Sequence, residues 1–322
     1  MSPTILVAGA TGNTGRSTTE TLSKLLQAPD SPLRNHRILA LTRSANSPAA
    51  ERLATLPGVE VVQQNWVEVT PEWLQTHQVT RAFIASHNKP NQFAEESTFH
   101  LALLHAGVKY VVRISTTAAF VRPDATAYYP RAHWAIEALL SAPEFKALHW
   151  TSLQPNVFGS FWFSPAAEFI KEYRKTGRAD TVLKMMAPKD GDVGVIDADE
   201  VGVVAAHLLV QEDTAIHNGR RYVLNGPEDI SGEKIVQMVQ RAIGVPVENV
   251  RYKDLSALDA FLEMEYNGNG NSQNVVWSIR RAAETAWDGQ FTAPPTSKEV
   301  LELAAPRRTP QQMLESLLEE LL

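Results

Sequence analysis

The sequence predicts an α/β protein built on a doubly wound parallel sheet of the Rossmann type, with a smaller interleaved C-terminal lobe. Short apolar runs alternate with longer amphipathic segments throughout the first half of the chain. A glycine-rich loop directly follows the first apolar run, where a strand would pass into a helix. Alternating strands and helices form right-handed crossovers, which produce a parallel sheet covered by helices on both faces.

The strands of this sheet are predicted from six apolar runs. The segments between the runs hold the helices that parallel strands require as crossovers. One helix runs from the glycine loop to Leu26, a second ends near His105, and a third carries His133. The six runs are Thr4–Ala8, Arg37–Thr42, Val59–Gln63, Arg81–Ser86, Lys109–Ser115 and His149–Gln154.

Beyond the sixth run the alternation becomes irregular, which indicates a second structural unit. We expect residues 1–157 to form the Rossmann domain and residues 158–322 to form the interleaved lobe. A helical pattern over Asp197–Val210 and a strand-like run over Arg220–Gly226 predict that residues 195–226 return to the main sheet.

Three segments of the second unit have clear local patterns. Ser231–Gly244 begins with a serine cap and stops at a glycine, so it is predicted to be a helix. The apolar residues of Met313–Leu321 share one helical face, which is typical of a docking helix. Tyr266–Asn274 is polar and rich in glycine, and we expect it to be a mobile loop that acts as a lid.

The composition excludes several classes of function. The chain has 30 basic and 36 acidic residues without a dense Lys/Arg run, so nucleic-acid binding is not expected. There is no cysteine, which rules out disulfides and thiolate chemistry, and the histidines lack metal-ligand spacing, so no metal site is assigned. The N-terminus lacks a signal-peptide pattern and no apolar stretch reaches membrane-spanning length, which predicts a cytoplasmic protein without a membrane partner.

The loop VAGATGNTGR places Gly9, Gly12 and Gly15 three residues apart between a strand and a helix. Glycine in such a loop permits a tight turn and a close backbone approach, and the helix N-terminus offers free N–H groups to a pyrophosphate. An ordinary tight turn is the structural alternative. The position after the first strand favours a dinucleotide site.

The end of the second strand predicts which dinucleotide binds. An acidic residue there would bind the adenosine ribose of NAD, but this strand ends in Thr42, Arg43 and Ser44. An arginine with neighbouring hydroxyl groups suits the 2′-phosphate of NADP. The alternative is a solvated surface arginine. We therefore expect NADP, as NADPH, to be the cofactor.

Six segments spread over nearly the whole chain resemble those of a known family. They are GATGNTG, AGVKYVVRIST, LQPNVF, DADEVGVVAAHLL, YVLNGPEDISGEKI and PPTSKEVLELAAPRRTPQQML. With these segments the chain resembles the NmrA-like family of atypical short-chain dehydrogenase/reductases. The family contains NADP-binding redox sensors that regulate transcription factors. It also contains reductases of quinones and of phenolic or alkaloid-like metabolites.

The resemblance implies a set of cofactor contacts around the carboxyl ends of the strands. The residues it implies at the phosphates, the adenine side and the nicotinamide ribose are Thr11, Asn13, Thr14, Asn65, Ser86, His87, Ser115, His133, Pro155, Asn156 and Val157. Any one of them is alternatively a loop residue without a cofactor contact.

The resemblance also implies catalytic residues, with one departure. Tyr129 matches the tyrosine of the Tyr-x-x-x-Lys pair and Thr117 the hydroxyl residue, but His133 stands where the lysine is expected. Glu137, four residues later, is predicted to keep His133 protonated. Because Tyr129 precedes Pro130, it is expected to cap the helix, which leaves Tyr128 as a substitute for it. Packing of the helix entry explains the same residues without catalysis.

Three functions remain open. The first is an NADPH-dependent reductase of a small aromatic or conjugated molecule, with Phe158 and Trp162 in the wall of the substrate pocket. The same aromatic residues are explained about as well by core packing between the lobes. The second function is a non-catalytic NADP sensor that binds a protein partner, for which a nuclear location is also open. The third is an isomerase or cyclase on a reused reductase fold.

Overall fold

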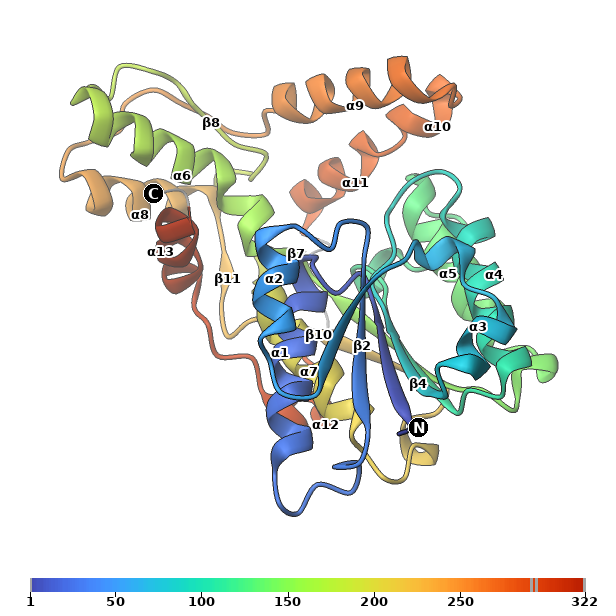
Figure 1. Cartoon of the computed structure of the whole chain (residues 1–322). Helices are drawn as coiled ribbons and strands as arrows, with labels where there is room; N and C mark the ends of the chain where they lie inside the picture. The colour runs from blue at the N-terminus through green and yellow to red at the C-terminus, as the bar shows by residue number, and fades with distance from the viewer. Residues whose placement is uncertain (1, 290–291, 293–294, 321–322) are drawn as a thin grey trace.

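The computed structural model describes residues 2–289, 292 and 295–320, and its centre is a seven-stranded sheet (Figure 1). All of its strands are parallel, in the order β10-β6-β5-β4-β1-β2-β3. The order reverses beside β1, which pairs with both β2 and β4 and therefore marks the switch point of the sheet. The strands are β1 (Thr4–Ala8), β2 (Arg37–Thr42), β3 (Val59–Gln63), β4 (Val79–Ile84), β5 (Tyr110–Ile114), β6 (His149–Pro155) and β10 (Arg220–Leu224).

Helices cover both faces of this sheet, as the doubly wound prediction requires. Successive residues of a strand point to opposite faces, and Ile5 and Val7 of β1 pack in one buried cluster while Leu6 and Ala8 pack in another. The first cluster lies under α1 (Asn13–Gln27), α7 (Ala198–Leu209) and α12 (Lys298–Ala304), with α2 (Pro48–Ala54) at its edge. The second lies under α3 (Pro71–Thr76), α4 (Gln92–Ala106) and α5 (Tyr128–Leu140).

A second lobe has its own apolar core, formed by helices around a small sheet. Its sheet has the order β11-β9-β7, and a further pair joins β12 to β8. Helix α13 packs on α6, which confirms the predicted docking helix. The elements are β7 (Val157–Phe158), α6 (Gly159–Thr176), β8 (Leu183–Lys184), β9 (Val193–Ile196), β11 (Asp229–Ile230), α8 (Gly232–Ile243), β12 (Val250–Arg251) and α13 (Pro310–Glu320).

The chain crosses between the lobes several times. It enters the second lobe after β6 and returns through α7 and β10, and β10 extends the main sheet beside β6. Later, Ser297 donates its backbone N–H to the carbonyl of Val223 at 3.0 Å, which fixes the entry to α12 on the main sheet.

Three helices, α9 (Ser256–Asn269), α10 (Gln273–Trp277) and α11 (Arg280–Thr285), form an arm above the carboxyl ends of the strands (Figure 1). The prediction of a mobile loop over Tyr266–Asn274 is therefore wrong. Buried Leu262 anchors α9, and Gly270 ends it at φ +65°. The glycine and polar residues of this segment thus end α9 and begin α10.

In the described part of the chain, no helix is both long enough and apolar enough to cross a membrane.

Candidate functional site

The glycine loop turns from β1 into α1 with almost no room for side chains. Gly9 has φ +84°, a conformation that other residues rarely adopt. A Cβ atom on Gly15 would lie 2.0 Å from the carbonyl oxygen of Gly9, so the helix start packs directly on the strand end. The first turn of α1 therefore lies at the carboxyl edge of the sheet, beside its switch point.

The residues of this loop fit a dinucleotide phosphate group. Gly12 donates to the carbonyl of Gly9, and the first α-helical bond runs from the N–H of Arg16 to Gly12. Among the described residues no acceptor is found for the N–H groups of Asn13, Thr14 and Gly15, and α1 has no side-chain cap. Three donors at a helix N-terminus, together with its dipole, suit a phosphate anion.

The end of β2 lies beside this loop. The hydroxyl oxygens of Thr11 and Thr42 are 3.4 Å apart, and Thr42 also bonds the backbone of Ser44. Arg43 is exposed, and no described residue forms an ion pair or hydrogen bond with its side chain. Its guanidinium is therefore available to an external anion.

The predicted residues after β3 and β4 lie in different settings. Asn65 is exposed and caps a short turn by accepting from the N–H of Val67 at 3.4 Å. Ser86 donates to Glu96 at 2.5 Å and so belongs to a buried polar network. Both ring nitrogens of His87 are engaged, one with Glu95 and the other with the backbone of residue 89. Of these residues, Asn65 is the most open to a ligand.

The ends of β5 and β6 bring together several predicted residues. The Thr117 hydroxyl donates to Asn156 Oδ1 at 3.4 Å, and that oxygen also accepts from the N–H of Val157. Pro155 is the last residue of β6. The hydroxyl oxygen of Ser115 is buried without a partner among the described residues. An unpartnered buried hydroxyl is unfavourable in isolation, and a bound ligand would relieve this cost.

Helix α5 begins two residues earlier than predicted. Tyr128 is its first residue and Ala127 its N-cap, so Tyr129 lies inside the first turn and does not cap the helix. Tyr129 is half-buried; burial raises its pKa, and a hydrogen bond with Thr116 acts in the opposite direction. The hydroxyl of Tyr128 donates to the carbonyl oxygen of Asn88, and burial raises the pKa of Tyr128 to about 12. Neither tyrosine is activated as a base by its surroundings.

Beneath these residues lies a buried network centred on Arg113 of β5. Its Nε donates to Glu96 at 2.6 Å, its Nη1 to Ser152 at 2.9 Å, and its Nη2 to Nδ1 of His133 at 2.8 Å. Glu96 also bonds His100, and the Arg113 charge keeps the pKa of Glu96 well below its usual range although burial opposes this. Arg113 is fully buried, so these bonds replace its hydration.

Glu137 pairs with other groups and not with His133, so the predicted pair that would keep His133 protonated is wrong. The Glu137 carboxylate accepts from Ser152, Gln154 and Arg221, the last at 2.7 Å, and lies 3.6 Å from Arg113. Burial and the neighbouring Arg113 charge lower the pKa of His133 to about 3. His133 is therefore neutral near neutral pH.

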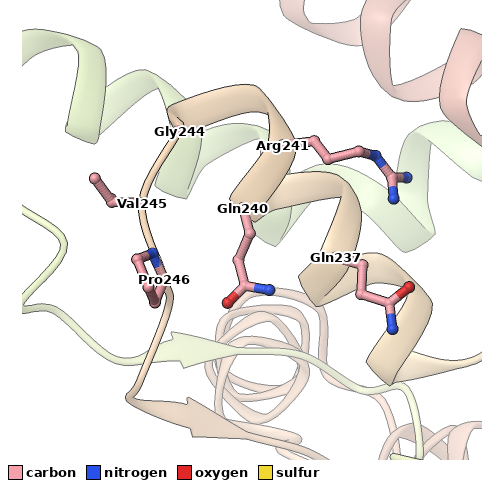
Figure 2. Close-up of a pocket in the computed structure, with 6 residues that line it drawn as sticks. All are labelled: Gln237, Gln240, Arg241, Gly244, Val245 and Pro246. Carbon is pink, nitrogen blue, oxygen red and sulfur yellow. The ribbon is translucent and has the colours of Figure 1, made fainter.

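The predicted pocket residues divide between the two lobes. Phe158 is partly buried against the core under α1 and α7. Trp162 is 5% exposed in the core of the second lobe, whereas Phe161 beside it is 56% exposed. An open hollow of about 550 Å³ lies elsewhere, at the end of α8 (Figure 2). Three polar side chains and the segment Gly244–Pro246 line it, and α8 lies in the second lobe, away from the carboxyl edge of the main sheet.

A sequence model of the NmrA-like family matches residues 1–273 of this chain. The chain belongs to the NmrA-like family. This membership agrees with the parallel seven-stranded sheet and with the glycine loop after β1.

Within residues 2–289, 292 and 295–320, no three acidic or histidine side chains gather in an arrangement that could hold a metal ion.

Relatives of this NmrA-like chain include named reductases. It is 29% identical over 252 residues to a (4-alkanoyl-5-oxo-2,5-dihydrofuran-3-yl)methyl phosphate reductase of Streptomyces griseus subsp. griseus, covering 78% of this chain and 77% of that protein. It is 26% identical over 246 residues to an NAD(P)H azoreductase of Xenophilus azovorans, covering 76% of each chain. Its fold is similar to that of an NADPH-dependent quinone oxidoreductase of Escherichia coli, whose structure was solved with NADPH. The TM-score is 0.70 at 20% sequence identity, and the match covers 97% of this chain and 99% of that chain.

Arg113, Glu96 and Asn88 of this NmrA-like chain were not predicted as site residues from the sequence. Arg113 carried a readable signal, because it interrupts the apolar run KYVVRIS of a strand expected to be buried on both faces. A charge in such a strand requires a buried partner of opposite charge. The carboxylate that pairs with Arg113 is Glu96, and its position depends on how α4 packs against the sheet.

Proposed function

We propose that this protein is an NADPH-dependent reductase of a small, flat, apolar molecule. The proposal is carried by one observation, the open N-terminus of α1 beside the unpaired Arg43 at the end of β2. The N–H groups at the helix end donate to the pyrophosphate, and the guanidinium donates to the 2′-phosphate. No acidic residue stands at the end of β2, where one would repel that phosphate.

The relatives support the reaction class. The azoreductase uses NAD(P)H and the quinone oxidoreductase uses NADPH, according to their names, and both substrate classes are flat and conjugated. NADPH supplies the hydride when it is bound. The substrate of this chain is proposed to bind between the arm of α9–α11 and the carboxyl edge of the sheet, where β7 with Phe158 directly follows the end of β6.

In this proposal the two parts of the chain have different roles, one in binding the dinucleotide and the other in binding the substrate. Residues 1–157 hold the dinucleotide, with Thr117, Ser115 and Asn156 beside the nicotinamide ribose. Residues 158–322 close the substrate side, and residues 195–226 complete the main sheet. Tyr129 is proposed to donate the proton, because its phenol is protonated near neutral pH and is hydrogen-bonded to Thr116, which follows β5.

A second candidate, a non-catalytic NADP-binding regulator, is favoured by one observation. His133 is neutral and occupies the position of the lysine that lowers the tyrosine pKa in catalytic relatives. NADPH oxidation followed with a quinone and an azo dye separates the two candidates. The reductase proposal requires consumption of NADPH that depends on the acceptor, and it fails if NADPH binds tightly but neither acceptor causes its oxidation.

A further inference from the structure

Asn88, four residues beyond β4, is held at two points by helix α5. The Tyr128 hydroxyl donates to its backbone carbonyl, and its side-chain Oδ1 lies 3.1 Å from Nε2 of His133. Tyr128 is itself fixed by the arm, since its N–H donates to the Ser278 hydroxyl at 3.1 Å. Asn88 thus lies between the carboxyl edge of the sheet and the arm.

Arg113 determines which way the Asn88 amide faces. A guanidinium has only donors, so Nδ1 of His133 must accept from it and the ring proton must be on Nε2. That N–H donates to Asn88, which must therefore turn its oxygen towards His133. The Nδ2 group of Asn88 is consequently directed away from His133.

The surrounding charges fix the direction of the hydrogen bonds that run from Arg113 to His133 and from His133 to Asn88. Two guanidiniums, buried Arg113 and the partly exposed Arg221, face two buried carboxylates, Glu96 and Glu137, so the charges of the network are already balanced. A proton on Nδ1 of His133 would break the bond from Arg113 and add a second positive charge beside it. The other groups that pack near the ring are the uncharged amide of Gln92 from α4 and the Tyr129 phenol one turn away.

The Nδ2 group of Asn88 is a donor without a described partner. Asn88 is exposed, and among the described residues its only bonds are those from His133 and Tyr128. A rigidly oriented amide donor at the mouth of a site gives specificity for an acceptor oxygen.

We propose that Asn88 binds the nicotinamide half of the dinucleotide, with Nδ2 donating to an uncharged oxygen of that half. This inference rests on the proposed function. The adenosine half extends over β2 towards Arg43, so the nicotinamide half crosses the switch point towards β4 and β5, where Asn88 lies. Arg113 and His133 act as positioning residues that orient the Asn88 amide.

Calorimetry with NADP⁺ and with 2′,5′-ADP tests the contact. Asn88→Asp keeps the oxygen that faces His133 and replaces the outward donor by an acceptor. We expect its NADP⁺ affinity to fall about tenfold or more, and Asn88→Ala to lose a similar factor, because one hydrogen bond is lost. Affinity for 2′,5′-ADP, which lacks the nicotinamide half, should be unchanged in Asn88→Ala. Asn249→Asp, an exposed asparagine of the second lobe, controls for the added charge.

The tautomer of His133 gives an independent readout. In ¹⁵N spectra of the labelled protein, we expect the ring to be the neutral Nε2–H form throughout the mildly acidic and neutral range, and His133→Gln identifies the signal. An imidazolium or an Nδ1–H form would overturn the proposed orientation.

The two proposals fail in distinguishable ways. If the wild type binds neither NADP⁺ nor 2′,5′-ADP, the proposed cofactor site is overturned, and the proposed role of Asn88 is overturned with it. If the wild type binds both ligands and Asn88→Ala binds NADP⁺ equally well, only the role of Asn88 is overturned. A loss on both ligands in Asn88→Ala also overturns it, because the defect would then lie in the fold of the site.

Discussion

Arg113 and His133 form a buried pair in which the guanidinium donates at 2.8 Å to Nδ1 of the imidazole. The pair replaces the lysine that the family motif leads one to expect. A lysine would bring a mobile cation to the site, whereas this arrangement keeps the cation beneath the site and presents a neutral ring. Under the proposed function, catalysis at this site would depend on oriented hydrogen bonds more than on a titrating charge.

Removal of the buried cation should strongly destabilise the protein. Arg113→Met leaves Glu96 buried without its main partner, and such losses are typically about 3–5 kcal/mol. Arg122→Met is the matched control, because Arg122 pairs with Asp124 on the surface and should cost less than about 1 kcal/mol. Urea unfolding of both variants measures the difference. Equal midpoints for the two variants would contradict the structural role of Arg113.

Stability should fall on mild acidification because of His133. Its folded-state pKa of about 3 lies below the ordinary 6.5, so the unfolded chain binds a proton first as the pH falls. The native state is then favoured above pH 6.5 and loses up to roughly 1.4 kcal/mol per pH unit below it for this one group. Buried His100, whose pKa is also lowered, adds in the same direction.

His133→Gln measures how much His133 contributes to the loss of stability at acidic pH. Glutamine does not titrate, but it keeps an acceptor for Arg113 and a donor for Asn88. Unfolding free energies of the variant should decline less than those of the wild type between pH 6.5 and 5.5, a range above the ordinary pKa of the carboxylates. Parallel declines in the two proteins would mean that the histidine is protonated in the native state.

The preference for NADP should depend on Arg43. Arg43→Ala removes a charge-assisted contact to the 2′-phosphate that is worth roughly 1.5–3 kcal/mol, so NADPH affinity should fall about tenfold or more. NADH affinity should not change, since NADH lacks that phosphate. Arg52→Ala, an exposed arginine of α2, controls for net charge. Calorimetry with both dinucleotides measures the ratio, and an equal loss for both would exclude selection by Arg43.

The glycine loop should tolerate no side chain at Gly15. An added Cβ would meet the Gly9 carbonyl at 2.0 Å, so Gly15→Ala must move the helix start away from the strand and disrupt the phosphate cradle. Gly177→Ala is a control in open space at φ +68°, where a modest stability loss near 1 kcal/mol is expected from backbone strain. We expect NADPH binding to be lost in the first variant and kept in the second, by fluorescence titration.

The parts of the fold that depend on local pattern could be predicted from the sequence. The first three strands begin and end where the apolar runs do, and the glycine loop can be recognised because its residues are consecutive in the sequence. Strand β4 begins at Val79, two residues before the predicted start, because polar Thr80 and Arg81 separate Val79 from the apolar run. Arg81 is accommodated there by donating to the carbonyl of Leu209 at 2.6 Å.

The parts that depend on distant residues could not be predicted in the same way. The spacing of His133 and Glu137 indicates a pair on one helix face, but buried partners from other strands outcompete that local contact. Glu137 finds Ser152 and Arg221, and His133 finds Arg113. Sequence spacing reports neighbours along a helix and carries no information on the strands beneath it.

The reductase proposal is tested most directly by following the hydride itself. NADPH deuterated at the transferable position of the nicotinamide is incubated with the wild-type protein and a quinone or an azo acceptor. Because deuterium delivered to a quinone oxygen or an azo nitrogen exchanges with water, the label is followed by mass spectrometry in the NADP⁺ that forms, together with the rate of NADPH oxidation. We expect NADP⁺ without the label, an acceptor-dependent oxidation that is slower with deuterated than with unlabelled NADPH, and a slower oxidation of NADH than of NADPH. Saturated binding of NADPH without its oxidation in the presence of either acceptor would contradict the proposal.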